Sequence, residues 1–233
     1  MVKKNDRPFF RRTLRWALVL VLLFAGVSVL QVVLLKGIDP PCTLMTAWGW
    51  VAHVAAGTPE PPHMYWRSLG EISPYMRRAV LAGEDQRFLK HMGFDFREIG
   101  EAVKDMFSGD AVRGASTITM QAARTVFLWP DRNWVRKSLE AYYTILMEVL
   151  WGKKRILEIY LNTVDWGQGI MGVEAASIRY FNVPASRISR IQAARLAAIL
   201  PSPHRWSPTK PNVQVSRREK RILRDMDKMP LIS

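Results

Sequence analysis

Cysteine and histidine are scarce in this sequence. Its 233 residues contain one cysteine, Cys42, so no intramolecular disulfide can form, and no Cys-x-x-Cys pair suggests a zinc knuckle or a redox site. The four histidines are scattered and never form a His-Glu-x-x-His or similar pair. A metal site built on these two residue types is therefore not expected.

Acidic residues are also few. Asp and Glu number 20 against 34 Lys and Arg, which leaves a formal net charge of +14 and an isoelectric point near 10.3. Apolar residues make up 48% of the chain and charged residues 23%, with nine Trp and nine Phe, so most of the chain can bury a core. This composition excludes disorder throughout, and the length accommodates one domain with a short appendage.

Charged side chains are absent from residues 16–35, WALVLVLLFAGVSVLQVVLL. A helix of this length, at about 1.5 Å per residue, spans the ~30 Å hydrocarbon layer of a membrane. A core helix with so little polar surface would need protein on all sides. A cleavable signal peptide usually has a shorter apolar region and an Ala-x-Ala-like site, whereas KGIDPPCTL follows here. We therefore expect a retained transmembrane helix.

The charges on either side of this segment predict its orientation. Six basic residues and Asp6 precede it, while only Lys36 and Asp39 follow closely. By the positive-inside rule, residues 1–15 form a cytoplasmic tail and residues 36–233 lie on the far side of the membrane. The outer portion is still basic, but nucleic acid is scarce there and lipid phosphates are close. We expect the membrane, and no nucleic acid, as a partner.

The rest of the chain is predicted to be mainly helical. Residues 36–65, rich in Pro, Gly, Ala and Trp, are interpreted as a linker and membrane-proximal segment with one short apolar helix at 44–56. Strand patterns are weak, and the three prolines between 202 and 211 predict an irregular segment. Further helices are expected at 74–91, 96–107, 116–128, 133–151, 153–164, 172–181, 187–199 and 215–229.

The segment VLAGEDQRFLKHMGFD contains the first candidate for chemistry. On a helix over 74–91, Glu84, Phe88 and His91 share one face at i, i+4 and i+7. Burial of a carboxylate on such a face raises its pKa toward the range that a general base requires. The alternative, favoured for this segment by itself, is structural: an ion pair of Glu84 with Arg87 or Lys90, or Asp85 capping a neighbour.

Two further stretches carry polar groups at predicted helix starts. In RGASTITMQAART, Ser116 is interpreted as a helix cap beside free backbone donors that could hold an anion. In DRNWVRKSLEAYY, three cations precede Glu140 at the predicted start of a helix: Arg132, Arg136 and Lys137. Positive charge is unfavourable at a helix N-terminus because of the helix macrodipole, so the presence of these cations needs an explanation. A solvated basic face is the simpler interpretation of each cation taken singly.

Two motif matches are rejected. GQGIMG at 167–172 fits Gly-x-Gly-x-x-Gly, but it follows a helical segment and lacks an acidic residue near the ~20-residue offset of a dinucleotide site. SPTK at 207–210 fits the Ser-x-x-Lys of penicillin-binding transpeptidases, yet no Lys-Thr-Gly follows it.

Five segments within residues 66–226 carry a resemblance: EDQRFLKHMGFD (84–95), RGASTITMQAARTVFL (113–128), RKSLE (136–140), KKRILEIYLN (153–162) and RxxxILxxM (218–226). In this order they resemble the peptidoglycan glycosyltransferases, the family that polymerises lipid II, and most of all its monofunctional, membrane-anchored members. Met120 departs from the pattern, since the family usually has the first of two glutamines there, while Gln121 keeps the second.

The resemblance implies a fold and a set of site residues. The fold is mainly α: a lysozyme-like, two-lobed helical domain at 66–233, with its smaller lobe dipping into the membrane, on a single N-terminal transmembrane helix. Glu84 is implied to be the general base and Glu140 a second essential carboxylate. The residues implied to hold sugar and pyrophosphate are Ser116, Gln121, Arg124, Arg132, Lys137 and Arg218; those implied to give structural support are Asp85, Asn162 and Glu174.

The implied reaction is an inverting glycosyl transfer that makes linear β-1,4 glycan strands and releases polyprenyl pyrophosphate. Glu84 would take the proton of the acceptor GlcNAc 4-hydroxyl as this attacks C1 of the donor MurNAc. Cations would stabilise the departing pyrophosphate, alone or with a divalent ion such as Mg²⁺ or Mn²⁺, and no tightly bound cofactor is implied. Glu140 could bind metal, orient Lys137 or assist the leaving group.

Location and partners follow from the same resemblance. The anchor would lie in the inner (cytoplasmic) membrane with the catalytic domain on the periplasmic side, and the partners would be lipid II, the growing glycan chain and cell-wall synthesis or division proteins. Two other functions stay open. A lytic enzyme on the same fold would need an acid to protonate a sugar alcohol leaving group, and the cluster of cations argues against it. The intact motif carboxylates argue against a catalytically silent scaffold.

Overall fold

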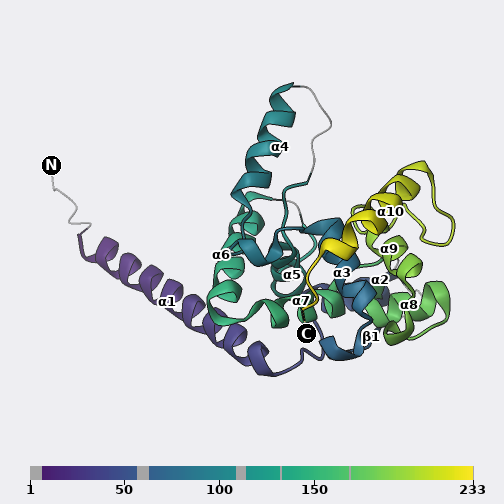
Figure 1. The fold of residues 1–233 in the computed structure, drawn as a ribbon. Coiled ribbons are helices and arrows are strands. Elements are labelled where there is room, and N and C mark those ends of the chain that lie inside the picture. The colour runs from purple at the N-terminus through teal and green to yellow at the C-terminus, as the bar shows by residue number, and fades with distance from the viewer. Residues whose placement is uncertain (1–6, 57–62, 109–113, 132, 168, 233) are drawn as a thin grey trace. The chain divides into compact units, whose positions relative to one another are not determined.

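The computed structural model describes residues 7–56, 63–108, 114–131, 133–167 and 169–232 (Figure 1). The chain divides into two units, residues 1–38 and residues 39–233. The first unit is the long helix α1 (Arg7–Gly37), whose stretch Arg11–Gly37 has a mean hydropathy of 2.9 and the length to cross a membrane. Large apolar side chains along it, such as Leu18 and Leu22, are exposed. The helix contains the whole predicted span of residues 16–35.

The second unit is mainly helical, as the sequence predicts. In the described part of the chain its only strands are β1 (His63–Met64) and β2 (Ile170–Met171), which pair in parallel. The 3₁₀ helices are η1 (Leu69–Glu71), η2 (Phe88–Lys90), η3 (Ala185–Arg187) and η4 (Met226–Lys228). The α-helices are α2 (Leu44–Ala56), α3 (Pro74–Glu84), α4 (Phe96–Ser108), α5 (Ile118–Phe127), α6 (Trp134–Leu150), α7 (Lys153–Thr163), α8 (Val173–Phe181), α9 (Arg190–Ile199) and α10 (Val213–Asp225).

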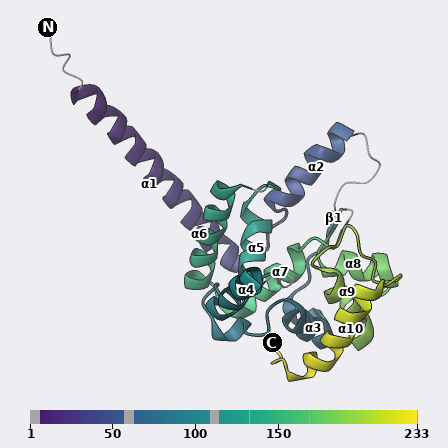
Figure 2. The ribbon, with the colours of Figure 1, turned by 90° about the horizontal axis from the view of Figure 1, so that it is seen from above.

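Helices α3, α9 and α10 form one group within this unit (Figure 2). Their contact buries apolar side chains of all three helices, among them Val80 and Leu196, which are fully buried. Gly83 makes the close approach possible, because a Cβ atom there would lie 3.1 Å from Ile222 Cδ1. The end of α3 is therefore held against both α9 and α10.

Helices α5, α6 and α7 form a second group, and α2 contacts α5. Tyr160 and Ile159 of α7 are fully buried, and Phe127 stacks on Tyr143 of α6 with ring centroids 4.3 Å apart. Helix α4 projects from the rest of the unit, and no residue of α4 is buried (Figure 1).

The prediction of one helix over 74–91 is wrong. Helix α3 ends at Glu84, and the backbone of Asp85 (φ −158°, ψ 78°) turns out of the helix before η2 begins. Glu84, Phe88 and His91 consequently do not share a helix face. The physical reason is tertiary, because the Asp85 carboxylate leaves the helix to accept a hydrogen bond from the Ile118 amide of α5 at 3.1 Å.

The interpretation of Ser116 as a helix cap is also wrong by one residue. Thr117 is the N-cap of α5, since its Oγ1 accepts a hydrogen bond from the Met120 amide at 3.2 Å and donates one to the Gly93 carbonyl at 2.5 Å. Ser116 instead precedes the helix, in the segment that faces the pocket described below. Smaller differences occur at α9, which begins three residues later than predicted, and at α10, which ends at Asp225.

Candidate active site

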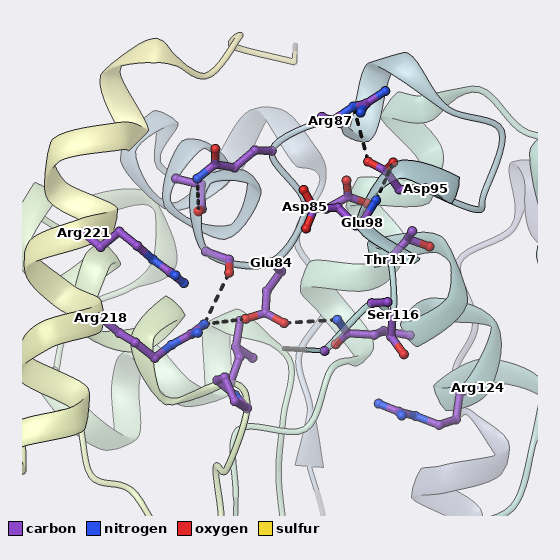
Figure 3. A pocket seen from close by; sticks show the side chains of 18 residues that line it. Glu84, Asp85, Arg87, Asp95, Glu98, Ser116, Thr117, Arg124, Arg218 and Arg221 are labelled. Atoms are coloured by element: carbon purple, nitrogen blue, oxygen red, sulfur yellow. Dashed lines mark hydrogen bonds and ion pairs between the residues drawn. The ribbon is translucent and has the colours of Figure 1, made fainter. Parts of the chain in front are cut away.

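A pocket of about 750 Å³ lies where the end of α3 meets α5 and α10 (Figure 3). The two helix groups each contribute one wall, and residues between α3 and α5 contribute the rest. Its ionisable lining residues are Glu84, Asp85, Arg87, Asp95, Glu98, Arg124, Arg218 and Arg221. Ser116, Thr117 and Gln121 add uncharged polar groups. The lining therefore brings guanidinium groups close to a small number of carboxylates.

Glu84 is the last residue of α3, and its side chain is only 11% exposed. Its Oε1 accepts a hydrogen bond from Arg218 Nη2 at 2.9 Å, and its Oε2 accepts one from Gln121 Nε2 at 3.1 Å (Figure 3). Burial raises the pKa of Glu84, and the positive charge of Arg218 opposes that rise. This carboxylate is positioned by two donors and poorly hydrated, as a general base must be.

Arg218 is itself anchored before it reaches Glu84. Its Nε donates to the Ala198 carbonyl at 3.1 Å, and its Nη2 also lies 3.3 Å from the Gly83 carbonyl. Burial lowers the pKa of Arg218 while the Glu84 carboxylate raises it. One guanidinium group thus joins α10, α9 and the end of α3.

The side-chain amide of Gln121 is oriented by a hydrogen bond from Tyr160. The hydroxyl of Tyr160 donates to Gln121 Oε1 at 3.3 Å, which leaves the Gln121 amide nitrogen to face Glu84. Burial raises the pKa of Tyr160 well above its usual range, so this hydroxyl keeps its proton. The order Tyr160, Gln121, Glu84 forms a directed hydrogen-bond chain from the core to the pocket.

Comparison with known proteins agrees with this geometry. Residues 53–227 match the model of the family described as Transglycosylase. The chain belongs to the transglycosylase family. It is similar to proteins named biosynthetic peptidoglycan transglycosylase, with 46% identity to one from Chromohalobacter salexigens, over 94% of this chain and 94% of that protein. A relative of the same name from Xanthomonas campestris pv. campestris (strain B100) is 47% identical over 89% of this chain and 85% of that protein. Another, from Pseudomonas aeruginosa, is 42% identical over 94% of this chain and 93% of that protein.

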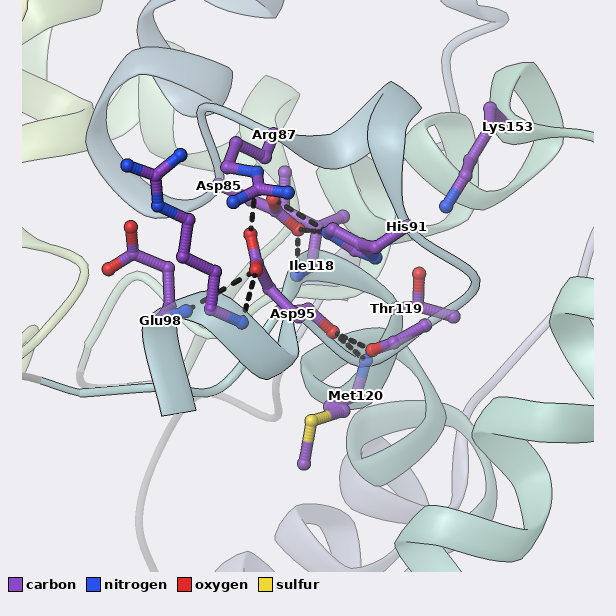
Figure 4. Close-up of polar contacts among 12 residues, drawn as sticks. Asp85, Arg87, His91, Asp95, Glu98, Ile118, Thr119, Met120 and Lys153 are labelled. Carbon is purple, nitrogen blue, oxygen red and sulfur yellow. Dashed lines mark hydrogen bonds and ion pairs between the residues drawn. The ribbon is translucent and has the colours of Figure 1, made fainter. Parts of the chain in front are cut away.

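Beneath the pocket of this transglycosylase, a buried polar network holds the segment between α3 and α5 (Figure 4). The carboxylate of Asp85 lies 2.9 Å from His91 Nε2 and also accepts from the Ile118 amide. Asp95 accepts from the Arg97 amide at 3.1 Å, which caps α4, and pairs with Arg87 Nε at 3.4 Å. The interpretation of Asp85 as a cap for a neighbour is confirmed, because Ile118 is the first residue of α5.

The other residues predicted as structural support make structural contacts. Asn162 accepts from the Arg67 amide and donates to the Arg67 carbonyl, both at 2.8 Å. Glu174 accepts from Arg67 Nη2 and from the Ala185 amide, also at 2.8 Å. Both side chains therefore tie the segment before α3 to α7 and α8.

The predicted second carboxylate lies on α6 and is almost fully buried. Glu140 Oε1 accepts from Lys137 Nζ at 2.5 Å, and its Oε2 accepts from Arg136 Nη1 at 3.2 Å. Glu140 and Lys137, both described by the structure, are not among the residues that line the pocket around Glu84. Arg132 lies outside the described residues.

The pocket thus gathers five of the predicted site residues: Glu84, Ser116, Gln121, Arg124 and Arg218. It also contains residues that the sequence analysis did not single out. Arg221 follows Arg218 by three positions on α10, and this helical spacing could have indicated a second cation on the same face. No sequence pattern indicates that Glu98 lines the pocket, because its position depends on how the chain turns between η2 and α4.

Met120, the departure from the family pattern, is a buried residue of α5. The polar contact to the Glu84 carboxylate is made by the next residue, Gln121. The substitution therefore leaves that contact in place.

Proposed function

We propose that this chain polymerises lipid II into linear β-1,4 glycan strands of peptidoglycan. The observation that carries the proposal is Glu84: a nearly buried carboxylate, held by Gln121 and Arg218, in a cationic pocket of a chain of the transglycosylase family. The relatives named biosynthetic peptidoglycan transglycosylase support the same activity.

In the proposed step, Glu84 accepts the proton of the acceptor 4-hydroxyl while that oxygen attacks C1 of the donor sugar. The bond between C1 and the pyrophosphate oxygen breaks from the opposite face, so the configuration at C1 is inverted. The raised pKa makes Glu84 a stronger base than a solvated glutamate, and the positive charge of Arg218 opposes that rise and favours the ionised form.

The departing pyrophosphate requires positive charge rather than an acid. Arg124 lines the pocket and is proposed to contact the diphosphate, together with Lys137 and Arg132. The contacts of Glu140 favour the interpretation that it orients Lys137, because one carboxylate oxygen accepts from the Lys137 ammonium at 2.5 Å.

A lytic reaction would need a protonated acid beside the leaving group. Two other carboxylates of the pocket, Asp85 and Asp95, already accept hydrogen bonds from backbone amides and are engaged in holding the fold. These contacts favour synthesis over cleavage.

A divalent cation, where the reaction uses one, is proposed to arrive with the substrate. Among the described residues, no three His, Cys, Asp or Glu side chains gather as a metal site. The pyrophosphate oxygens would then supply most of the ligands. We expect a chelator to lower lipid II turnover only if this substrate-bound ion contributes; unchanged turnover with excess chelator would assign the charge stabilisation to Arg124 and its neighbours alone.

The proposal places α1 in the inner membrane, with residues 39–233 on the periplasmic side. The length and apolar composition of Arg11–Gly37 support an anchor, and the basic residues before it support a cytoplasmic N-terminus. Such an anchor keeps the pocket near a substrate whose polyprenyl chain stays in the bilayer.

The experiment is a turnover assay with fluorescent lipid II and the purified full chain in detergent. We expect the wild type to make glycan chains that lysozyme digests, and Glu84→Gln to lower the rate by at least about 10²-fold, since general base catalysis contributes that much. Glu101→Gln is the matched control: Glu101 pairs with Lys104 on α4 and does not line the pocket, so this variant should keep wild-type turnover. Polymerisation by Glu84→Gln at the wild-type rate would refute the assignment of the base.

A further inference from the structure

Helix α2 carries a large exposed apolar surface. Leu44 is 44% exposed, Trp48 54% and Trp50 55%, and Val51 and Val54 reach 66% and 63%. One side of the helix contacts α5, and Figure 2 shows the helix standing beside α5, away from α3, α9 and α10. A soluble domain rarely leaves so many large apolar side chains of one short helix in water.

The start of α2 is capped by hydrogen bonds that do not involve this apolar surface. Thr43 and Thr46 exchange hydrogen bonds at its start: the Thr46 amide donates to Thr43 Oγ1 at 3.1 Å, and the Thr43 amide donates to Thr46 Oγ1 at 2.8 Å. Both threonines are buried, and their hydroxyl groups find hydrogen-bond partners within the protein. The exposed remainder is apolar in composition.

The position of α2 in the chain indicates what covers it. Only residues 38–43 separate α2 from the end of α1, and at about 3.5 Å per residue they reach no more than ~25 Å. Residues 40–59 contain no Asp, Glu, Lys or Arg. Where α1 crosses a membrane, α2 is therefore restricted to the neighbourhood of its surface.

We propose that α2 lies in the membrane interface, with Trp48, Trp50, Val51 and Val54 in the lipid at the boundary of headgroups and acyl chains. Its 13 residues give a length of about 20 Å, too short to cross a ~30 Å hydrocarbon layer. Tryptophan is enriched at this boundary. The inference rests on the membrane anchor of the proposed function and adds a second, separate membrane contact.

Two properties favour lipid over a protein partner. Residues 40–59 offer no Asp, Glu, Lys or Arg side chain for specific pairing with a protein, whereas apolar insertion needs none. The apolar surface of α2 also follows the anchor helix α1 closely in the sequence. A membrane that holds α1 is therefore already near α2, whereas a protein partner would first have to diffuse to it. Contact by this mechanism should depend little on lipid charge or salt.

The test uses the full chain in vesicles of phosphatidylcholine and phosphatidylglycerol. Cys42 is the only cysteine, so Cys42→Ser provides a background in which Val51→Cys carries a nitroxide spin label. Accessibility to oxygen, which concentrates in lipid, is compared with accessibility to a water-soluble nickel chelate. We expect the Val51 label to be oxygen-accessible and shielded from nickel, and to stay so in pure phosphatidylcholine and in high salt.

Val213→Cys is the matched control, because Val213 is also 66% exposed but belongs to α10. Its label should be reached by the nickel chelate, while a label at Leu22→Cys in α1 should report deep lipid. A Val51 label as accessible to nickel as the Val213 label would overturn the inference. So would a Val51 label shielded from both reagents in proportion to protein concentration, which would assign the surface to a second copy.

Polymerisation of lipid II in the same vesicles separates this inference from the proposed function. Active protein with a water-exposed Val51 label refutes the membrane contact alone, and inactive protein with a lipid-exposed label refutes the activity alone. We also expect Trp48→Asp combined with Trp50→Asp to lower turnover several-fold in vesicles but not in detergent, where the substrate needs no alignment with a bilayer. Equal turnover of this variant and the wild type in vesicles would contradict the contact.

Discussion

Glu84 experiences opposing electrostatic influences, and their balance decides its working pH. Burial raises its pKa, while Arg218, the hydrogen bond from Gln121 and the charge of Arg221 lower it. A general base acts only when ionised, so turnover falls as the pH drops through the pKa of Glu84. The net rise predicts that this acid limb lies above the pH at which a solvated glutamate titrates.

Arg221 gives a residue-scale prediction. It lines the pocket and acts on Glu84 through its charge, with no hydrogen bond to Glu84 among the described contacts. Arg221→Gln removes a charge that lowers the pKa of Glu84, so that pKa rises and the acid limb of kcat moves to higher pH. Arg221→Lys keeps the charge and should keep the wild-type profile. The measurement is lipid II turnover against pH for the three proteins.

An Arg221→Gln profile that is lowered uniformly, without a shift of the acid limb, would contradict this electrostatic role. Such a result would instead indicate a substrate contact made by the guanidinium group.

At the scale of elements, the N-terminus of α5 connects the fold to the site. Thr117 caps the helix, Asp85 accepts from its first amide, and Gln121 stands one turn further on. A change in the cap therefore moves the group that hydrogen-bonds Glu84.

Thr117→Ala tests this connection. Loss of an N-cap side chain lowers the free energy of unfolding by about 1 kcal/mol, and we expect turnover to fall as well, because Gln121 loses its fixed position. Ser189→Ala is the matched control: Ser189 caps α9 by accepting from the Gln192 amide and does not line the pocket. It should lose similar stability and keep its activity. Thermal unfolding in detergent and the turnover assay give the two readouts, and full activity of Thr117→Ala would contradict the connection.

At the scale of the whole molecule, one helix is expected to place the domain on one side of the membrane. Basic residues precede the apolar stretch of α1 and are nearly absent just after it. The orientation follows from this asymmetry.

Fusions to the C-terminus measure the orientation. We expect alkaline phosphatase, which needs an oxidising compartment, to be active there, and green fluorescent protein exported by the same route to be dark. Moving basic residues from positions before α1 to positions after it should weaken this result. A fluorescent, phosphatase-inactive pair for the natural sequence would place residues 39–233 in the cytoplasm and refute the proposed localisation.

The sequence by itself determined the features that depend on local pattern. The apolar length of α1, the helical periods of α4, α6 and α7, and the irregular stretch before α10 were all predicted within a few residues. The five motif segments identified the family, and with it Glu84, Gln121, Arg124 and Arg218, which the structure gathers in one pocket.

Only the tertiary structure decided where those elements stop and which side chains meet. Helix α3 ends at Glu84 because the Asp85 carboxylate accepts a hydrogen bond from the Ile118 amide, 33 positions away in the sequence. The pattern of residues 74–91 holds no information about this distant partner. Gly167 shows the same limit: a Cβ atom there would lie 2.3 Å from the Pro203 carbonyl oxygen, so close packing, not a phosphate, accounts for this glycine. Helix periodicity is local, whereas hydrogen bonds and close contacts between distant segments form only once the chain has folded.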